Sequence, residues 1–488
     1  MNASTIALVF AVLAIVVDFV VRVLALIFVP RNRRPQTATA WLLAIFFLPY
    51  IGILLFLLLG SRRLPRGRRK KQAEINARIM DVTEGLDLVT KDDPAPHWLE
   101  PIVELNRHLG AMPLVGGNSA TLQPNYALSL AAMTDAVGNA RKYVHAEFYI
   151  LAFDSTSAPF FAALEAAVKR GLPVRVLLDH VASLRSPHYH RTIRELKRIG
   201  VDWHLMLPLQ PLRGKWRRPD LRNHRKILVL DGIVAFTGSQ NFIDASYNKR
   251  SNKRRGLQWK DLMVRFEGPI VAGINALFVT DWYSETNDLI LRETELTATE
   301  NDGDRDLDAQ VVPSGPGFDG ENNLRLFNSL LYAAQERIIL TSPYFVPDES
   351  MLYAITTAAQ SGLDVQLFVS EIGDQGLVYH AQRSYYEELL RAGVRIWLYK
   401  KPIVLHAKHF TVDDQVAVIG SSNMDMRSFS LNFEISVMVR GRRFVNQMRE
   451  LEQSYRENSR ELTLEEWLVR PWPSRVLDNV ARLTAAVQ

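Results

Sequence analysis

The chain has 488 residues, a hydrophobic share of 48% and a formal net charge of +6 at pH 7. This length exceeds one ordinary core, so we expect two or more domains, and the positive balance favours an anionic partner, either nucleic acid or an acidic membrane surface. The lack of cysteine excludes disulfides, thiolate nucleophiles and cysteine-ligated zinc.

Two apolar runs open the chain. Thr5–Val29 is long enough to cross a hydrocarbon core of roughly 30 Å as a helix. Its two charges, Asp18 and Arg22, lie four residues apart on one helical face, where they can neutralise each other. Ala38–Gly60 carries no charge and reads as a return helix, kinked at Pro49. The pair predicts an uncleaved two-helix transmembrane hairpin, because the first run is too long for a signal peptide.

Basic residues surround the second run. The flank after it contains Arg62, Arg63, Arg66, Arg68, Arg69, Lys70 and Lys71, and the linker before it contains Arg31, Arg33 and Arg34. The larger cluster favours the cytoplasmic side for the downstream domains, although the linker charges oppose this for a two-pass anchor. The cluster could also hold anionic lipid headgroups.

The rest of the chain contains one unit twice. In the first copy, strands are predicted at 143–151, 173–179 and 201–206, with helices at 159–171 and 191–200. In the second copy, strands are predicted at 337–346, 363–370 and 394–399, with helices at 350–362 and 383–393. This alternation predicts an α/β fold of two duplicated domains with a largely parallel sheet. Because the acidic stretch Glu293–Asn323 reads as a connection, the predicted domains are residues 1–71, 72–295 and 296–488.

Each copy leads into the same signature, His-x-Lys-x4-Asp-x6-Gly-Ser-x-Asn. The members are His224, Lys226, Asp231, Gly238, Ser239 and Asn241 in the first copy, and His406, Lys408, Asp413, Gly420, Ser421 and Asn423 in the second. A single His-x-Lys is most often a surface basic pair. Six fixed residues at matched places of a repeat are a strong signal of a shared site.

The catalytic motif is predicted to comprise His224, Lys226, Asp231, His406, Lys408 and Asp413. Residues two apart in a strand point to one face, so a pseudo-twofold pairing of the copies would bring two histidines and two lysines to one pocket. Such a pocket suits a phosphodiester: the lysines stabilise its oxygens, one neutral imidazole attacks phosphorus, and the other protonates the leaving alkoxide. The two aspartates lie at odd spacing from the lysines, so we expect them to face away and support the turn.

Further residues are predicted to assist the pocket. Asp261 and Glu434 hold equivalent places on the strand after each motif, and we expect them to orient the histidines through the second ring nitrogen. Ser239, Asn241, Ser421 and Asn423 are predicted to add donors to phosphate, while Gly238 and Gly420 allow close backbone approach.

Two basic loops flank the first motif. Leu207–Asn223 contains Arg213, Lys215, Arg217, Arg218 and Arg222 around Trp216, and Asn248–Asp261 contains Lys249, Arg250, Lys253, Arg254, Arg255 and Lys260. A solvated charge run is the ordinary interpretation, but two such loops in a membrane-anchored chain indicate an anionic lipid. A metal site at His188 and His190 is the competing chemistry, disfavoured because no clustered carboxylates accompany them.

The duplicated motif resembles the phospholipase D superfamily, and the whole chain is similar to the bacterial cardiolipin synthase family. The matching features are the two-helix anchor, NRRP between its helices, LPYIGILLFLLLG, both motif copies and GLQWKDLMVRFEGPI. The resemblance implies a protein of the bacterial cytoplasmic membrane that transfers a phosphatidyl group from one phosphatidylglycerol to another, giving cardiolipin and glycerol. It implies a phosphatidyl-histidine at His224, with His406 as acid and then base, and no metal or cofactor.

Other functions stay open at this level. A hydrolase, either a phospholipase D or a nuclease, would use the same histidine pair with water as acceptor. Membrane anchoring argues against the nuclease, so no nucleic-acid partner is expected. A non-catalytic lipid-binding scaffold would not need two intact motifs. The acceptor lipid and a homo-oligomeric state are not fixed by the sequence.

Overall fold

The computed structural model describes residues 3–31, 33–60, 64–85, 96–210, 218–290, 306–318 and 320–484. The chain forms two compact units, Met1–Arg63 and Leu64–Gln488, here called the amino-terminal unit and the large unit. The basic flank after Arg63 therefore belongs to the large unit, and the two copies share one compact unit instead of forming two separate ones.

The amino-terminal unit contains three helices, α1 (Ala3–Phe28), α2 (Pro35–Phe47) and α3 (Pro49–Leu59). Among the described residues, only α1 is long and apolar enough to span a membrane, over 24 residues. The predicted return helix is broken, because Leu48 leaves the helical region (φ −133°, ψ 69°) ahead of Pro49, which has no N–H to donate. The two-helix hairpin is thus not confirmed.

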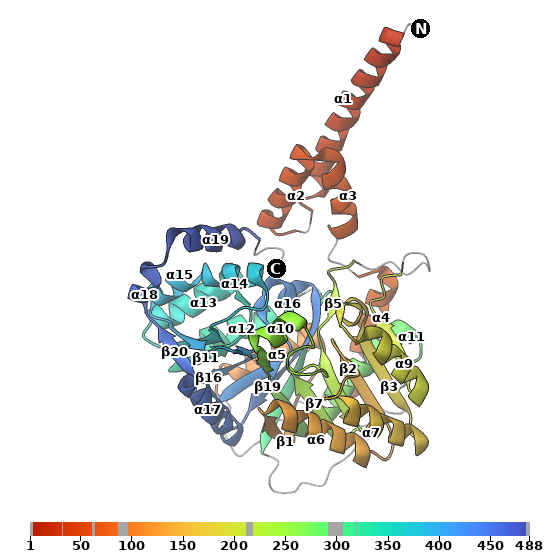
Figure 1. Ribbon diagram of the computed structural model, residues 1–488, viewed down its shortest axis with the longest axis vertical. Coiled ribbons are helices and arrows are strands. Elements are labelled where there is room, and N and C mark those ends of the chain that lie inside the picture. Colours follow the sequence, from red (N-terminus) through yellow and green to blue (C-terminus); the bar gives the residue numbers. More distant parts are fainter. Residues whose placement is uncertain are drawn as a thin grey trace. The chain divides into compact units, whose positions relative to one another are not determined.

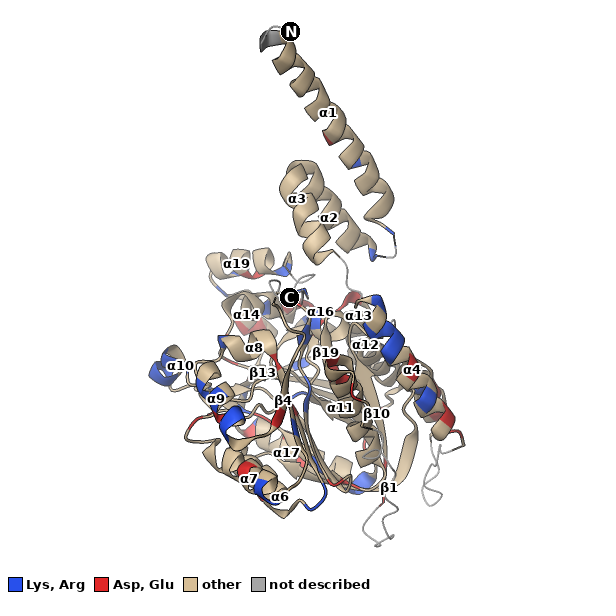
Figure 2. Cartoon of the chain, turned by 90° about the vertical axis from the view of Figure 1, so that its right-hand side faces the viewer, with Lys and Arg blue, Asp and Glu red and all other residues tan. Residues whose placement is uncertain are grey.

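Helices α2 and α3 fold back beside α1. A Cβ on Gly52 would lie 2.6 Å from the Ala44 carbonyl oxygen, so α3 approaches α2 at backbone distance. The Arg33 guanidinium donates to the carbonyls of Val29 (2.6 Å) and Gly60 (3.1 Å). Because Val29 follows α1 and Gly60 follows α3, the α2–α3 pair starts and ends at the same end of α1 (Figure 2).

A single mixed sheet forms the centre of the large unit (Figure 1). In spatial order, its strands are β4 (Asp202–Met206), β3 (Val174–Asp179), β2 (Val144–Phe148), β6 (Lys226–Leu230), β7 (Val234–Gly238), β9 (Met263–Glu267), β1 (Leu114–Gln123), β10 (Leu307–Ser314), β19 (Asn432–Arg440), β17 (Val416–Gly420), β16 (His409–Val412), β11 (Arg337–Thr341), β13 (Asp364–Ser370), β14 (Arg395–Tyr399) and β20 (Ser459–Leu462). Strands β1 and β10 pair in the middle, and the order on one side repeats on the other. The predicted duplication is confirmed.

The prediction of a largely parallel sheet is wrong. Along the described path from β4 to β20, the parallel pairs lie among the outer strands β2–β3–β4 and β11–β13–β14, and the short strand β5 (Arg222–Asn223), off this path, also runs parallel to β19. Within each motif the chain turns tightly at the aspartate and forms the hairpins β6–β7 and β16–β17, and a tight hairpin can join only antiparallel strands. The predicted connection Glu293–Asn323 also contains β10, which pairs with both β1 and β19, while residues 291–305 lie outside the described residues.

Helices cover both faces of the sheet (Figure 1). The described helices of the large unit are α4 (Arg66–Val82), α5 (Leu99–Gly110), α6 (Tyr126–Asn139), α7 (Ala158–Lys169), α8 (His180–Arg185), α9 (Tyr189–Ile199), α10 (Arg250–Arg255), α11 (Ile270–Thr286), α12 (Asn322–Ala333), α13 (Glu349–Gln360), α14 (Gly376–Arg383), α15 (Tyr386–Ala392), α16 (Met426–Ser430), α17 (Arg442–Glu457), α18 (Leu464–Leu468) and α19 (Trp472–Arg482). Short strands β5 (Arg222–Asn223), β8 (Gln258–Lys260), β12 (Phe345–Val346), β15 (Ile403–Leu405) and β18 (Met424–Asp425) complete the unit.

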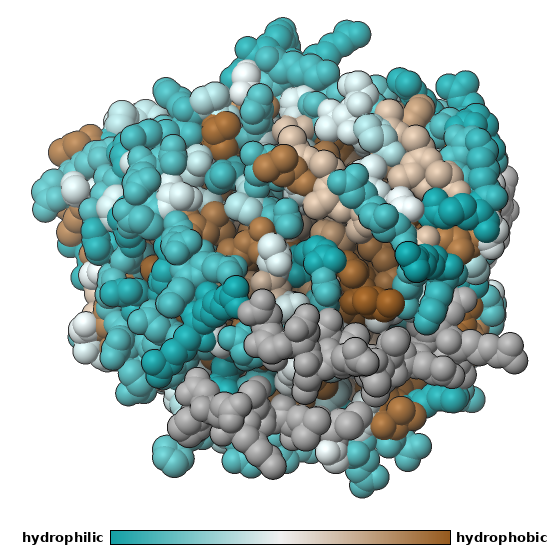
Figure 3. All heavy atoms as spheres, turned by 90° about the horizontal axis from the view of Figure 1, so that it is seen from below, coloured by the Kyte–Doolittle hydropathy of each residue, from teal (hydrophilic) through white to brown (hydrophobic). Residues whose placement is uncertain are grey.

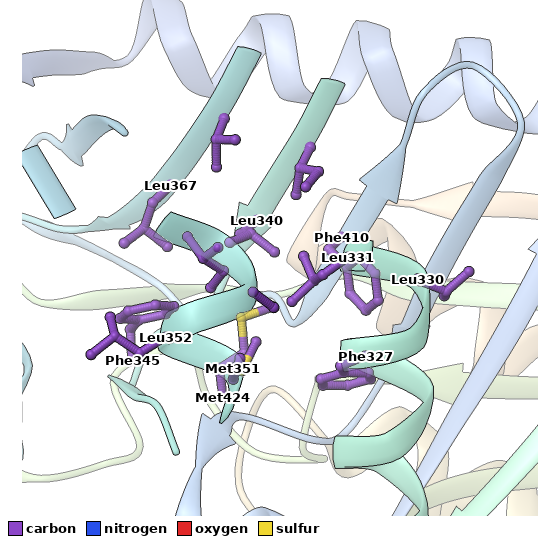
Figure 4. Close-up of a cluster of buried hydrophobic side chains, with 14 of the residues drawn as sticks. Phe327, Leu330, Leu331, Leu340, Phe345, Met351, Leu352, Leu367, Phe410 and Met424 are labelled. Atoms are coloured by element: carbon purple, nitrogen blue, oxygen red, sulfur yellow. The ribbon is translucent and has the colours of Figure 1, made fainter. Parts of the chain in front are cut away.

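Apolar packing ties the copies together. In the second copy, Phe327 of α12 and Met351 of α13 pack against Leu340 and Phe410 of the sheet (Figure 4). Leu99 of α5, which precedes the first copy in sequence, is buried in this same cluster. A second core cluster contains residues of both copies. The copies therefore share core clusters within one compact unit. The face of the molecule seen from below in Figure 3 is hydrophilic around its rim and has a hydrophobic area near its centre.

The motif glycine Gly420 is required by strand packing. A Cβ at this position would lie 2.1 Å from the Ile435 carbonyl oxygen, on backbone that cannot move independently of β19. We expect Gly420→Ala to cost about 1–3 kcal/mol of stability through overpacking and to lower the Tm in detergent. Gly138→Ala is the matched control, because nothing lies within 4 Å of its Cβ and a helical alanine is favoured. An unchanged Tm for Gly420→Ala would contradict this account.

Candidate active site

Each motif histidine is placed by a short strand that pairs with the other copy. Strand β5 of the first copy runs parallel to β19 of the second, with Asn223 opposite Phe433. Strand β15 of the second copy runs parallel to β8 of the first, with Leu405 opposite Lys260. The histidines are the next residues in each register. Their N–H groups continue the ladders: His224 donates to the Phe433 carbonyl (2.9 Å), and His406 donates to the Lys260 carbonyl (2.7 Å).

This exchange pairs each histidine with the carboxylate of the other copy. The Nδ1 atom of His224 lies 3.0 Å from Glu434 Oε2 and 3.0 Å from the Ser421 carbonyl oxygen. The Nδ1 atom of His406 lies 2.7 Å from Asp261 Oδ1. With both Nδ1 atoms held, Nε2 is the ring nitrogen left for chemistry. Sequence reasoning selected both carboxylates as orienters but could not show that the pairs cross between copies.

The two motif lysines are buried beside the histidines. Lys226 Nζ donates to the His224 carbonyl, and Lys408 Nζ donates to the His406 carbonyl at 2.6 Å. His224 lies in the link between β5 and β6, so the extended segment that the sequence predicts as one strand is interrupted there. His and Lys of each copy nevertheless project into the same buried region.

Burial and positive charge lower the pKa values of both histidines, but to different extents. Burial lowers the pKa of His224 well below its usual value, and the charges of Lys226, Lys408 and His406 lower it further. Burial and Lys408 also lower the pKa of His406, but Asp261 opposes this through its charge and its hydrogen bond. Of the two imidazoles, His406 therefore has the stronger support for its protonated form.

The charged partners respond to the same burial. It lowers the pKa of Lys226 to about 7 and that of Lys408 to about 8. Burial raises the pKa of Glu434 to about 7, against the opposing charge of Lys226. Burial alone would raise the pKa of Asp261, but His406 and Lys408 outweigh it and hold this pKa below its usual value. The surroundings thus favour the charged form of Asp261 and the neutral form of Glu434, although the two carboxylates hold equivalent positions.

The motif serines do not have the predicted role. Ser239 Oγ donates to Asp261 Oδ1 at 2.7 Å and accepts from the Leu262 N–H at 2.9 Å. Ser421 Oγ donates to Glu434 in the same way. Each hydroxyl hydrogen is therefore engaged by a carboxylate, and the serines hold the orienting groups instead of facing phosphate.

The motif asparagines occupy unlike environments. Asn241 is engaged within the protein: it accepts from the Ile150 N–H (3.1 Å) and donates to the Tyr247 hydroxyl (2.8 Å). Asn423 is also buried, and its Oδ1 has no hydrogen-bond partner. The predicted role as a phosphate donor thus fits Asn241 poorly.

Asp231 and Asp413 lie outside the pocket. The Asp231 carboxylate accepts from the N–H groups of Arg141, Lys142 and Tyr143 at 2.7–3.0 Å. Asp413 accepts in the same way from residues 335–337 of the second copy. Each anchors the turn after its motif strand to the start of the neighbouring strand. This is the supporting role expected from their odd spacing, and it sets them apart from the histidines and lysines.

Several residues near the site were missed by sequence reasoning. The Tyr149 ring contacts His224 edge-on at 4.8 Å between centroids, and the Tyr344 ring lies 6.3 Å from that of His406. The Tyr344 hydroxyl donates to Asp374 at 3.0 Å. Both tyrosines follow the first strand of their copy, but superposing YVHAEFYIL and RIILTSPYFV places Tyr149 opposite Pro343, so only an alignment with a one-residue gap could have found them.

A buried arginine supports the first histidine alone. Arg225 pairs with Asp281 and donates through Nε to the Glu434 carbonyl oxygen at 3.1 Å. The equivalent residue of the second copy is Ala407. The backbone that carries His224 and its carboxylate is thus held by an additional ion pair. The only sequence signal for it is this difference between the two copies.

The remaining predictions concern loops and metals. Residues 211–217 of the first basic loop lie outside the described residues; Arg218 pairs with Asp220, and Arg222 pairs with Asp179. The second loop forms the short helix α10, whose basic residues are exposed. In the described part of the chain, no group of three or more His, Asp or Glu side chains is placed so that it could hold a metal ion. His188 and His190 are therefore not part of such a group.

Comparisons with known proteins show which family the chain is similar to. The family model described as "Cardiolipin synthase, PLD-like domain" matches residues 133–273 and 327–455, and one described as "Phospholipase_D-nuclease N-terminal" matches 20–61. The chain is 33% identical to cardiolipin synthase A of Proteus mirabilis over 457 residues, covering 92% of each chain. It is 32% identical to cardiolipin synthase of Geobacillus kaustophilus, covering 94% of this chain and 90% of that one.

The fold has a solved counterpart. The crystal structure of phosphatidylserine synthase from Haemophilus influenzae matches with a TM-score of 0.60 and 14% identity, over 79% of this chain and 99% of that one. At this identity the likeness shows the fold alone. The family model, the relatives that match 92–94% of this chain, the duplicated signature and the crossed histidine pair lead to one conclusion: the chain belongs to the cardiolipin synthase family and carries the phospholipase D-like domain of that family twice.

Proposed function

We propose that the protein transfers a phosphatidyl group between two phosphatidylglycerol molecules, giving cardiolipin and glycerol. The observation that carries this proposal is the pair of buried histidines, each held at Nδ1 by a carboxylate and each beside a buried lysine. Two imidazoles with free Nε2 atoms supply a nucleophile and a general acid–base, and the lysines supply charge for the phosphoryl oxygens. The names of the relatives, which are cardiolipin synthases, support cardiolipin as the product.

In the first step, Nε2 of His224 attacks the phosphorus of one phosphatidylglycerol. A P–N bond forms and the bond to the headgroup glycerol breaks, while His406 gives its Nε2 proton to the departing alkoxide. In the second step, His406 takes a proton from a headgroup hydroxyl of the second phosphatidylglycerol. That oxygen attacks phosphorus, the P–N bond breaks, and His224 is released neutral. No metal or cofactor has a part in this sequence.

The assignment of roles rests on the unequal surroundings of the histidines. A nucleophile must be neutral, and the pKa of His224 is lowered well below its usual value by burial and by both lysines. The acid must be protonated, and Asp261 favours the protonated form of His406. Arg225 further fixes the backbone around His224. Each of these differences favours His224 as the residue that carries the lipid.

We also propose how the chain meets the membrane. Helix α1 crosses the bilayer, and α2 and α3, which are each too short to span it, enter and leave on one side. This arrangement places two basic segments on one side of the membrane: the linker with Arg31, Arg33 and Arg34, and the basic flank of the sequence after Gly60. Both segments then favour the cytoplasmic side for the large unit. In a two-pass anchor they would lie on opposite sides and favour opposite orientations.

Lipid analysis tests the reaction itself. Purified full-length protein in detergent is incubated with phosphatidylglycerol, and the products are identified by mass. We expect cardiolipin and glycerol in equal amounts. Phosphatidic acid without cardiolipin would instead indicate a hydrolase, and cleavage of single-stranded DNA at a comparable rate would indicate a nuclease.

A trapped intermediate tests the two histidine roles. We expect His406→Ala, given a phosphatidyl ester of p-nitrophenol that leaves without an acid, to release one p-nitrophenol per chain and retain the phosphatidyl group. Mass analysis of the tryptic peptides should place this group on His224. His224→Ala is the matched control and should form no adduct. An adduct on His406 in that control would reverse the assignment.

The crossed carboxylate predicts a shift in pH dependence. Asp261 raises the pKa of His406, so its removal lowers that pKa and depletes the protonated acid at lower pH. We therefore expect the alkaline limb of kcat/KM to move to lower pH in Asp261→Asn. In the control Ser239→Ala the carboxylate stays, and the limb should shift less. A limb that moves to higher pH in Asp261→Asn would contradict the pairing.

A further inference from the structure

Helix α19 of the large unit presents an apolar stripe to solvent. The exposed fractions are 73% for Trp472, 49% for Val476, 55% for Val480 and 84% for Leu483. At 100° per residue these side chains fall on one side of the helix. Val469, just before the helix, is also exposed. Scattered exposed apolar residues are ordinary, but an aligned row on one helix marks an interaction surface.

The orientation of α19 is fixed by its inner face. Asp478 is fully buried there and lies 2.7 Å from His380 Nδ1 and 3.3 Å from Arg383 Nε, both on α14. Ala481 is buried in the adjoining core. Rolling the helix to hide the stripe would expose Ala481 and separate Asp478 from both partners. The stripe is therefore held outward by a buried ion pair.

The exposed charges that α19 itself carries beside the stripe are positive. Arg475 and Arg482 lie on the exposed surface of α19, and Arg482 is 3.3 Å from Glu388. Asp478 is the one carboxylate within α19, and it is buried on the inner face. An apolar row that begins with tryptophan and is flanked by arginines has the composition of a helix that lies in the interface of an anionic bilayer.

The stripe adjoins the His406 side of the active site. Helix α14, on which α19 packs, begins directly after Asp374 and Gln375, which bond to the Tyr344 hydroxyl. The Tyr344 ring in turn lies 6.3 Å from the His406 ring. Leu377 of α14 is also exposed. An apolar surface thus lies one helix away from the acid–base histidine.

We propose that α19, with Leu377 of α14, docks the large unit on the surface of the bilayer that holds its lipid substrate. A lipid surface is favoured over a second copy of the chain by area: the exposed face of this 11-residue helix measures roughly 170 Å² from helix dimensions, whereas a stable protein interface buries about 800 Å² per partner. A bilayer requires no matching partner surface. Because the chain also carries a membrane-spanning helix, even weak docking would be populated by effective concentration.

Label depth tests the docking without any reaction. The chain has no cysteine, so Val476→Cys gives a single site for a nitroxide label on the full-length protein. The control is Lys169→Cys on α7, which lies at the opposite end of the large unit from α19 (Figures 1 and 2). In vesicles of phosphatidylglycerol and phosphatidylethanolamine, we expect oxygen to relax the Val476 label more than a water-soluble nickel chelate does, and the reverse at Lys169. A water-exposed label at Val476, or spin–spin broadening from a second copy, would overturn the proposal.

A second experiment measures the effect on catalysis, and this one rests on the proposed function. Val476→Glu/Val480→Glu places carboxylates on a water-exposed surface, so the fold should be retained. We expect a tenfold or larger rise in apparent KM on vesicles and an unchanged rate on substrate dispersed in detergent micelles. Leu128→Glu, at an exposed position of α6, is the control and should change neither. Equal losses in vesicles and micelles would overturn the docking role, whereas absence of cardiolipin formation in the unmodified protein would refute the reaction and leave the label result intact.

Discussion

The active site depends on an exchange of short strands between the two copies. Strand β5 adds to β19, β15 adds to β8, and the ladder in each case ends where a histidine meets a carboxylate of the other copy. Neither copy alone contains a complete histidine–carboxylate pair. The shared cores and the central β1–β10 pairing are therefore conditions of the chemistry as well as of the fold, since they hold the two halves in register.

Burial of charge makes this pocket effective and costly. Removal from water destabilises the charged forms of lysine, histidine and carboxylate side chains unless each is paired, and a buried charge without its partner costs several kcal/mol. The fold meets this requirement with hydrogen bonds from Ser239 and Ser421 to the carboxylates and with backbone carbonyls for both lysines. The same burial lowers the pKa values of Lys226 and Lys408 to about 7 and 8. An anionic phosphodiester bound beside these lysines would stabilise their charged forms.

The membrane contacts proposed for the chain differ in kind. Helix α1 has the length and composition of a span, whereas α2 and α3 are too short because the chain breaks at Leu48–Pro49. Helix α19 has 11 residues, as many as α3, and has one apolar exposed side, a pattern suited to lying on a membrane instead of crossing it. If both contacts form, the large unit is held at two points, which would restrict the orientation of its active site relative to the lipid surface.

Much of the fold and site could be predicted from the sequence, because local patterns carried the information. Because the unit occurs twice, the order of its strands and helices could be predicted. The repeated His-x-Lys signature indicated both histidines and both lysines, and the strands after it indicated Asp261 and Glu434. Tertiary structure alone decided which carboxylate meets which histidine, that the serines serve the carboxylates, and that Arg225 pairs with Asp281. These contacts join residues far apart in the chain. They depend on the strand register between the two copies, and no local sequence pattern specifies that register.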